Sequence, residues 1–463
     1  MTLGIEFETN CAYCLALHSE YASDSFEADD TSLGTAAVQN VTNISKVLGG
    51  HFQMASYLGW KVSGMGSTSR TVVIVGAGLA GIRTAEQLRE GDFEGSITIL
   101  GAETHAPYDR PPLSKGALKA PSPVPPSLID PERIVELNID LRLGVAAQSL
   151  DAQAKKVLLA NGEALAYDSL VISTGAHAKT LGSMALPPEV QVLRTFDDAA
   201  KLSAKLASSG RLVVIGAGFI GCEVAATASE MGTQVSLIEA APTPLYLPAG
   251  EIVGAEVAAW HLSHGIDLRC DTKLVRFIGE DHLQGVELST GEVIEASAVV
   301  LGLGATPTTG WLADSGLDIT DGVLCDASGK TAIADVYALG DVARWAPAGR
   351  QEHWTSAISQ SRVVAENIIH DGTLTLTDGD ALPYFWSDMY GLKLQAVGST
   401  GLGFQNKTLR LGPDKDRLVV LYGMDGKFVG VVAASLPRVV NRSRALIVEG
   451  VGLDEAYEAL AAI

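Results

Sequence analysis

The apolar residues of this chain fall into short runs that are bounded by glycines, and one such run begins the first recognisable structural unit. Val72–Val75 are four consecutive apolar, mostly β-branched residues, a pattern typical of a strand buried on both faces. Gly76–Gly81 follow at once, a helical pattern runs from Ile82 to Leu88, and Ser96–Leu100 form a second apolar run. This order predicts a strand, a glycine turn, a helix and a parallel strand.

The same pattern returns about 140 residues further along the chain. Leu212–Ile215 precede the glycine stretch Gly216–Gly221, a helical segment follows, and Val235–Glu239 close the unit. Two dinucleotide-binding units in one chain predict two different dinucleotides. We expect one to stay bound as a flavin and the other to exchange as a nicotinamide.

The three glycines of each unit have separate physical tasks. The first permits a tight turn, the second lets the backbone approach a pyrophosphate, and the third lets the helix pack against the sheet. The helix N-terminus then points its N–H groups at the phosphates. The residues concerned are Gly76, Gly78 and Gly81 in the first unit, and Gly216, Gly218 and Gly221 in the second.

An acidic residue ends the second strand of each unit, where it can accept hydrogen bonds from ribose hydroxyls. Glu103 has this position in the first unit and Glu239 in the second. A carboxylate there also repels a 2′-phosphate, and no Lys or Arg follows Glu239 until Arg269. The second unit is therefore predicted to prefer NADH over NADPH.

Composition narrows the class of protein further. The chain has 463 residues, 47% of them hydrophobic, and a net charge of −21, which argues against nucleic acid or an anionic membrane as general partners. No apolar run reaches the roughly 18 residues that span a bilayer. The first 45 residues lack Lys and Arg, so no signal peptide is predicted. Five cysteines, two of them in one CxxC, are typical of a reducing cytoplasm and not of a secreted disulfide framework.

Residues 1–66 differ from the rest of the chain. Cys11 and Cys14 are one helical turn apart, and His18 follows on the same face, where it can exchange protons with a thiolate. The segment resembles the redox motif of the alkylhydroperoxidase D/carboxymuconolactone decarboxylase family, although the upstream helices and acidic residue of that family are missing. An intact peroxidase module, a partial thiol role, and a fusion remnant or docking extension all stay open. No second ligand pair is present, so no metal site is predicted.

A second resemblance covers about residues 70–460. Pro107-Tyr108-Asp109-Arg110-Pro111-Pro112-Leu113-Ser114-Lys115 is similar to a motif of the ferredoxin reductases that serve aromatic-ring dioxygenases and cytochrome P450 systems. Tyr384–Asp388 is similar to a later motif of the same family. The resemblance implies an NADH-dependent FAD flavoprotein that passes electrons to a ferredoxin or similar small carrier, as a monomer or homodimer.

The resemblance also implies roles for individual residues. Lys115, Glu223 and Trp354 would shape the hydride-transfer site, with Glu223 contacting the nicotinamide carboxamide and facing Lys115 across the flavin. A strand would place Asp341 at the N-terminus of a helix, near the ribityl chain. The remaining positions implied in FAD binding are Arg110, Val145, Thr174 and Gly175, and Gly304 is implied in NAD binding.

Cysteine is absent from Gly81 to Leu212, where related disulfide reductases carry their redox thiols. This absence favours direct single-electron transfer to a protein acceptor over disulfide chemistry. Cys222, Cys270 and Cys325 are interpreted as packing residues. Arg438, Arg442 and Arg444 form a basic cluster that can dock an acidic ferredoxin or can be an ordinary solvated helix face.

These observations predict an α/β protein with two Rossmann-like units of the glutathione-reductase type and a C-terminal α+β domain. The expected divisions are a helical extension at 1–66, an FAD-binding domain at 70–184 and 306–381, an NAD-binding domain at 185–305, and a C-terminal domain at 382–463. Two other functions stay open. One is an NADH-driven peroxide reductase that uses the Cys11/Cys14 dithiol, and the other is a signalling or structural flavoprotein like apoptosis-inducing factor.

Overall fold

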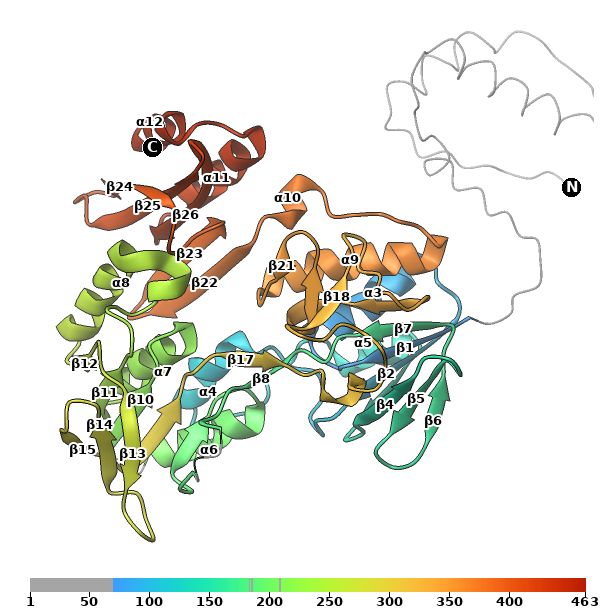
Figure 1. The fold of residues 1–463 in the computed structure, drawn as a ribbon, viewed down its shortest axis with the longest axis horizontal. Helices are drawn as coiled ribbons and strands as arrows, with labels where there is room; N and C mark the ends of the chain where they lie inside the picture. The colour runs from blue at the N-terminus through green and yellow to red at the C-terminus, as the bar shows by residue number, and fades with distance from the viewer. Residues whose placement is uncertain (1–69, 183, 185, 208–209) are drawn as a thin grey trace, which may run out of the picture. The chain divides into compact units, whose positions relative to one another are not determined.

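The computed structural model describes residues 70–463 apart from 183, 185, 208 and 209, all within one compact unit, Ser67–Ile463. Our predictions for Cys11, Cys14 and the rest of residues 1–66 fall outside the described residues. The described residues form three five-stranded sheets with their helices (Figure 1). The predicted fold class, with two Rossmann-like units and a C-terminal α+β part, is confirmed.

The first sheet is wholly parallel and contains the first apolar run as its central strand. Its order is β19 (Val336–Ala338), β7 (Ser169–Ile172), β1 (Thr71–Val75), β2 (Ser96–Gly101) and β3 (Ile139–Leu143). Packed with it in one core are α3 (Leu79–Glu90), α9 (Trp354–His370) and the small sheet β4 (Ala147–Asp151), β5 (Lys156–Leu159) and β6 (Ala164–Ala166). Central β1 is buried throughout except at its first residue, as a continuous apolar run predicts.

The second sheet repeats this plan. Its parallel order is β12 (Asp267–Arg269), β11 (Gln234–Ile238), β10 (Arg211–Ile215), β16 (Ala298–Leu301) and β9 (Val190–Val192). Alternate residues of its strands pack against α6 (Phe196–Leu206), α7 (Phe219–Glu230) and α8 (Tyr246–Ser263). The intervening residues pack against the antiparallel sheet β13 (Leu274–Ile278), β14 (Gly285–Leu288) and β15 (Val293–Glu295).

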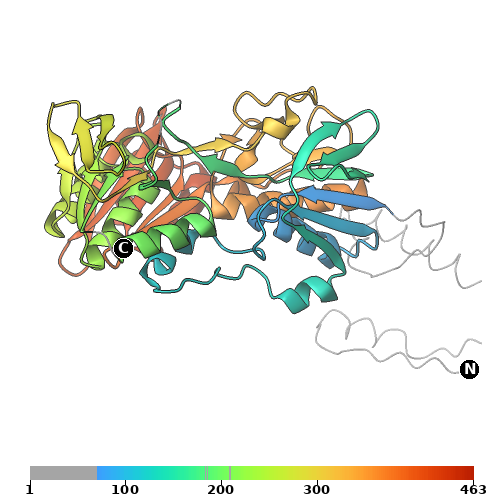
Figure 2. The same ribbon diagram turned by 90° about the horizontal axis from the view of Figure 1, so that it is seen from below.

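The chain passes from the first sheet to the second and back through a two-stranded ribbon. Its strands, β8 (Ala176–Ala178) and β17 (Ala305–Pro307), pair antiparallel and run side by side between the two sheets (Figures 1 and 2). The shorter elements are η1 (Pro111–Ser114), α4 (Gly116–Lys119), α5 (Pro131–Glu136), η2 (Gly310–Leu312), β18 (Val323–Cys325), η3 (Gly340–Val342), β20 (Ala343–Trp345), β21 (Gly349–Arg350) and α10 (Asp378–Ala381).

The third sheet is antiparallel, in the order β22 (Tyr384–Met389), β23 (Leu392–Gly398), β26 (Lys427–Ala434), β25 (Arg417–Met424) and β24 (Gln405–Leu411). One face packs against α11 (Pro437–Glu449) and α12 (Leu453–Ala461). The other face joins the helices of the second sheet in a single hydrophobic core, so the second and third sheets share buried surface.

One local prediction needs correction. Asp341 was expected to begin a helix, but η3 is a single three-residue 3₁₀ turn. The chain continues at once into β20, which pairs with β18 and β21, and this sheet pairing replaces further helical turns. Among the described residues, no helix is both long enough and apolar enough to cross a membrane.

Candidate active site

A cavity of about 760 Å³ lies where the carboxyl ends of the first sheet meet α7 and β22. The carboxyl ends of parallel strands are the usual ligand-binding edge of an open α/β sheet. Most of the sequence-predicted site residues line it: Gly76, Gly78, Glu103, Arg110, Lys115, Val145, Thr174, Gly175, Gly218, Glu223, Gly304, Asp341 and Trp354. The predicted residues that do not line it are Gly81, Gly216, Gly221 and Glu239.

The first glycine turn has the geometry that its sequence predicts. Gly76 has φ +122°, and a Cβ there would lie 2.2 Å from the carbonyl oxygen of Ser173. A Cβ on Gly81 would lie 2.0 Å from the carbonyl oxygen of Gly76, so Gly81 sets the packing of α3 on the sheet. A Cβ on Gly78 would meet no described atom within 4 Å, which leaves the space before the N-terminus of α3 open to a ligand.

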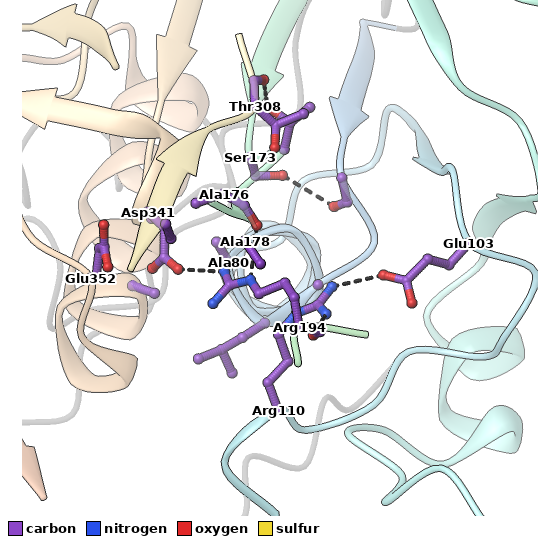
Figure 3. Close-up of a pocket in the computed structure, with 18 of the residues that line it drawn as sticks. Ala80, Glu103, Arg110, Ser173, Ala176, Ala178, Arg194, Thr308, Asp341 and Glu352 are labelled. Atoms are coloured by element: carbon purple, nitrogen blue, oxygen red, sulfur yellow. Dashed lines mark hydrogen bonds and ion pairs between the residues drawn. The ribbon is translucent and has the colours of Figure 1, made fainter. Parts of the chain in front are cut away.

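A carboxylate and a guanidinium that line the cavity pair with each other. Arg110 Nη2 lies 2.8 Å from Glu103 Oε1, and Tyr108 donates its hydroxyl to Glu103 Oε2 (Figure 3 shows the Arg110–Glu103 pair). Burial raises the pKa of Tyr108 to about 12, so the phenol stays protonated and can donate. Glu103 follows the end of β2, where a carboxylate can accept hydrogen bonds from ribose hydroxyls.

A second cation in the cavity was missed from the sequence. Arg194 donates from Nη2 to Asp341 Oδ2 at 2.7 Å and from Nε to the carbonyl oxygen of Ala176 at 2.8 Å (Figure 3). Arg110 donates from Nη1 to the carbonyl oxygen of Arg194 at 2.6 Å. Arg194 belongs to no recognisable motif, and it precedes Thr195, the N-cap of α6. Only the fold brings its side chain to the ligand-binding edge.

Lys115 and Glu223 form a direct ion pair. Lys115 Nζ lies 2.8 Å from Glu223 Oε2, and the Glu223 side chain is 4% exposed. The expectation that these residues face each other across the flavin is therefore wrong. Lys115 follows η1 and is the N-cap residue of α4, so the Pro111-Pro112 pair does place it at a helix start, as predicted.

Aromatic rings from α7, from β22 and from the start of α9 line the same cavity. Trp354 donates its indole N–H to Asp109 Oδ1 at 2.9 Å, and its ring lies 6.2 Å from that of Trp386 on β22. Phe385 stacks on His353 with ring centroids 5.3 Å apart and contacts the edge of Phe219 at 4.6 Å. Burial lowers the pKa of His353, so this ring is neutral near pH 7. Phe219 is the variable residue of the second glycine motif, a position that the sequence argument left without a role.

The second glycine turn matches the first. Gly216 has φ +99°, and a Cβ on Gly221 would lie 1.9 Å from the carbonyl oxygen of Gly216. A Cβ on Gly218 would meet no described atom within 4 Å. Glu239 accepts the backbone N–H of Ala217 at 2.6 Å and that of Ala241 at 2.8 Å, so its carboxylate is held beside this turn.

Arg269, the next cation along the chain after Glu239, is close to that residue in the fold. It pairs with Ile238 across β11 and β12, but its guanidinium is bound by Asp267 at 2.6 Å and by Glu292 at 3.0 Å. Its charge is therefore neutralised by two carboxylates. Glu239, in contrast, has no ion-pair partner among the described residues.

The three described cysteines are free and do not line the cavity. Burial raises the pKa of Cys222, raises that of Cys270 to about 11 and raises that of Cys325 to about 12. At neutral pH these thiols are protonated and therefore poor nucleophiles.

The cavity suits a large phosphate-bearing dinucleotide. Its volume lies within the range of roughly 300–1,000 Å³ that is usual for ligand sites. Arg110, Arg194 and the N-terminus of α3 supply positive charge for a pyrophosphate, while Glu103 and Asp341 supply acceptors for hydroxyl groups. Among the described residues, no side chain caps the N-termini of α3 or α7, so their first N–H groups remain available. These residues therefore fit FAD.

Two dinucleotide turns and a cavity with a Lys–Glu pair and aromatic walls define a flavoprotein oxidoreductase that uses a nicotinamide cofactor. Residues 70–361 match the family of pyridine nucleotide-disulphide oxidoreductases, and residues 384–461 match the reductase C-terminal family. The chain belongs to the first of these families and, within it, to the FAD-dependent ferredoxin–NAD(P)+ reductases. It binds FAD and NAD(H).

Individual relatives support this assignment. The chain is 37% identical over 377 residues to a ferredoxin–NAD(P)+ reductase of a Sphingomonas species, covering 79% of this chain and 90% of the relative. It is 36% identical over 350 residues to the ferredoxin–NAD+ reductase component of the p-cumate 2,3-dioxygenase system of Pseudomonas putida, covering 73% and 84%. It is also similar to the solved covalent complex of putidaredoxin reductase with putidaredoxin, with TM-score 0.78, 28% identity, and coverage of 85% of this chain and 99% of that chain.

Proposed function

We propose that this protein passes electrons from NADH to a small ferredoxin-type carrier that serves an oxygenase, either a Rieske dioxygenase or a cytochrome P450. The observation that carries the proposal is that residues of both nucleotide units line one shared cavity. The described residues that line it include a Lys–Glu pair and aromatic rings but no cysteine. A thiol relay from this cavity therefore has no support, and direct transfer to a protein acceptor is favoured.

The chain's own residues bind and orient the reactants. Arg110, Arg194 and the two uncapped helix N-termini hold pyrophosphates, and Glu103 and Glu239 accept ribose hydroxyls. The bound flavin supplies the exchange between a two-electron hydride and single electrons. Lys115 offers a positive charge at the cavity wall, which favours an anionic ligand there. Trp354, whose indole N–H is bound by Asp109, places an aromatic ring on the cavity wall.

A surface near the cavity fits an acidic partner. Arg438 and Arg442 are exposed on α11, and Arg444 lies over the ring of Tyr384 at 4.9 Å. The Tyr384 ring stacks on Trp386 at 6.0 Å, and Trp386 lines the cavity. A basic face that is connected to the cavity by aromatic rings favours docking of an acidic iron–sulfur protein over the alternative of a plain solvated helix face.

The preference for NADH rests on Glu239 and on the neutralised Arg269. We also propose the functional division predicted from the sequence: FAD bound by 70–184 and 306–381, NAD bound by 185–305, and a C-terminal domain at 382–463. The free thiols Cys222 and Cys325 are consistent with a reducing cytoplasm.

The test is NADH oxidation by the purified, FAD-loaded full-length protein with two alternative acceptors. One acceptor is a [2Fe–2S] ferredoxin coupled to cytochrome c, and the other is an alkyl hydroperoxide. We expect rapid cytochrome c reduction that requires ferredoxin and is unchanged in the Cys11→Ser/Cys14→Ser variant. Peroxide turnover that is lost in this variant would replace the proposal with a dithiol peroxide reductase. Very slow flavin reduction by NADH, with a long-lived charge-transfer complex, would instead indicate a signalling flavoprotein.

A further inference from the structure

The carboxylate of Glu223 lies where the elements of all three sheets meet, and every side of it has a hydrogen-bond donor. Oε2 accepts the Ser114 hydroxyl at 2.5 Å and lies 2.8 Å from Lys115 Nζ. Oε1 accepts the Ser387 hydroxyl at 2.7 Å and the backbone N–H of Asp388 at 3.4 Å. Two of these donors come from the first nucleotide unit and two from the third sheet.

This arrangement gives the two members of the ion pair, Lys115 and Glu223, different tasks. A carboxylate has about four lone-pair sites, and all four have a donor here, so Glu223 has no free acceptor for a ligand. An ammonium has three N–H groups. Lys115 uses one for Glu223 and one for the carbonyl oxygen of Pro111 at 3.1 Å, which leaves one for a molecule in the cavity. Lys115 is therefore the member that meets the ligand, and Glu223 fixes the position of Lys115.

The pairing of β22 with β23 fixes the position of Ser387. The strand pairs with β23 along its whole length, from Tyr384 opposite Val397 to Met389 opposite Leu392. Side chains alternate between faces, so Phe385, Ser387 and Met389 share the face toward α7. Ser387 is completely buried on that face, and its hydroxyl makes the shorter of the two contacts to Oε1.

We propose that Ser387 is a positioning residue for hydride transfer, which acts through Glu223 to hold Lys115 at the cavity wall. This inference rests on the proposed function, since it concerns the same cavity. Its consequence is that the C-terminal domain completes the reaction site, in addition to any part it has in docking. Without the Ser387 hydroxyl, Oε1 keeps only the 3.4 Å contact, and the carboxylate can turn and release Lys115 from its position.

The experiment compares Ser387→Ala with Ser443→Ala. Ser443 is a matched control because it is also completely buried, belongs to the same C-terminal part on α11, and has a hydroxyl without any partner among the described residues. For each FAD-loaded variant we would measure the rate of flavin reduction by NADH, the reduction potential of the bound flavin, and the melting temperature. A lost hydrogen bond to a charged group predicts a roughly tenfold slower reduction in Ser387→Ala. The potential should become more negative, because a positive charge near the flavin stabilises its anionic reduced form.

A second comparison shows whether Ser387 acts through Lys115. In a Lys115→Met background, adding Ser387→Ala should change neither the rate nor the potential further, because the group that it positions is gone. The Ser387→Cys variant keeps a similar volume and a weak donor, so its rate should lie between those of wild type and Ser387→Ala. It also replaces Ser387→Ala if the latter fails to retain FAD.

Two results would overturn the inference: a Ser387→Ala variant that matches Ser443→Ala, or an undiminished effect of Ser387→Ala in the Lys115→Met background. Ferredoxin-dependent cytochrome c reduction by the wild type is measured in parallel. Its absence would reject the proposed function alone, because the effects on flavin reduction and potential are read without any ferredoxin.

Discussion

At the scale of single residues, the cavity depends on charged side chains that pair across long stretches of sequence. Arg110 meets Glu103 and Tyr108 close to it in the chain, whereas Arg194 reaches Asp341, 147 positions away. Each guanidinium therefore has a carboxylate partner and a place on the cavity wall. A planar guanidinium held in this way suits a pyrophosphate, whose oxygens accept paired N–H groups.

Removal of Arg194 should weaken FAD binding. Arg194→Ala deletes the bond to Asp341 and one of the two guanidinium groups, and we expect roughly tenfold or greater loss of FAD affinity. The measurement is the dissociation constant obtained by titrating the deflavinated protein with FAD. Arg142→Ala is the control, because Arg142 is also held by ion pairs, in its case with Asp140 and Glu163, but does not line the cavity. Equal losses in both variants would contradict a specific role for Arg194.

Replacement of Glu239 should relax the cofactor preference. In Glu239→Ser the carboxylate that repels a 2′-phosphate is gone, along with an acceptor for ribose hydroxyls. We expect the KM for NADH to rise about tenfold and the ratio of NADPH to NADH activity to rise by at least that factor. Steady-state kinetics with each cofactor measure both quantities, and Glu295→Ser, at an exposed carboxylate on β15, should change neither. An unchanged ratio in Glu239→Ser would disprove the assignment.

The residues that sequence predicted and those it missed differ in a physical way. Glu103 and Glu239 follow strands at the end of a local pattern, so spacing alone locates them. Arg194 and Ser387 act on partners that are 147 and 164 positions away. Arg194 belongs to no local pattern, and the motif that contains Ser387 does not reveal its partner, because only the meeting of separate sheets creates these contacts. The direct contact between Lys115 and Glu223 was mispredicted for the same reason.

At the scale of elements, β22 connects the three sheets through alternate side chains. Phe385 contacts the rings of His353 and Phe219, Ser387 bonds Glu223, and Trp386 on the other face lies beside Trp354. Among the described strands, β22 is an edge strand that pairs only with β23, so no other strand separates it from the helices of the first and second sheets. Two of its residues, Phe385 and Trp386, line the cavity.

The glycine turns provide a test at the same scale. Gly221→Ala places a Cβ 1.9 Å from the carbonyl oxygen of Gly216, so α7 must move away from the sheet. Gly218→Ala meets no described atom within 4 Å and has an ordinary φ of −71°, so the fold accepts it. We expect Gly221→Ala to lose about 2 kcal/mol or more of unfolding free energy. Gly218→Ala should keep its stability and raise the KM for NADH several-fold, because its methyl group enters the space for the cofactor.

Urea unfolding and NADH kinetics of the two glycine variants separate these effects. Equal destabilisation by both substitutions would mean that the turn is purely structural. An unchanged KM in Gly218→Ala would mean that the open space before α7 does not receive NADH.

At the scale of the whole described unit, the second and third sheets share one core, and a buried histidine marks their contact. His261 on α8 is completely buried, and its Nδ1 lies 2.7 Å from the hydroxyl of Tyr390, between β22 and β23. Its Nε2 has no partner among the described residues. Burial, with a smaller contribution from the charge of His264, lowers the pKa of His261 to about 4.

This histidine makes stability depend on pH with a definite sign. Below its ordinary pKa of about 6.5, the unfolded chain binds a proton that folded His261 does not accept until about pH 4. The stability present above pH 6.5 is therefore lost as the pH falls toward 4, by about 3 kcal/mol. His261→Gln should flatten the curve of unfolding free energy in this window, measured by urea unfolding at intervals from pH 7 to 4. His370→Gln, at an exposed site, should leave it unchanged, and parallel curves for wild type and His261→Gln would disprove the effect.

Two neighbouring strands of the first sheet, β7 and β19, are far apart in the sequence, and this separation affects folding during synthesis. Strand β7 ends at Ile172, but its neighbour β19 begins only at Val336, after the entire second sheet. A ribosome that adds roughly 5–20 residues per second needs on the order of 10–30 seconds to make the intervening chain. During that interval the nascent protein exposes the edge of a buried, strongly apolar strand to other chains. The yield of native protein in cells should therefore depend on translation speed and on chaperones that protect this edge until β19 emerges.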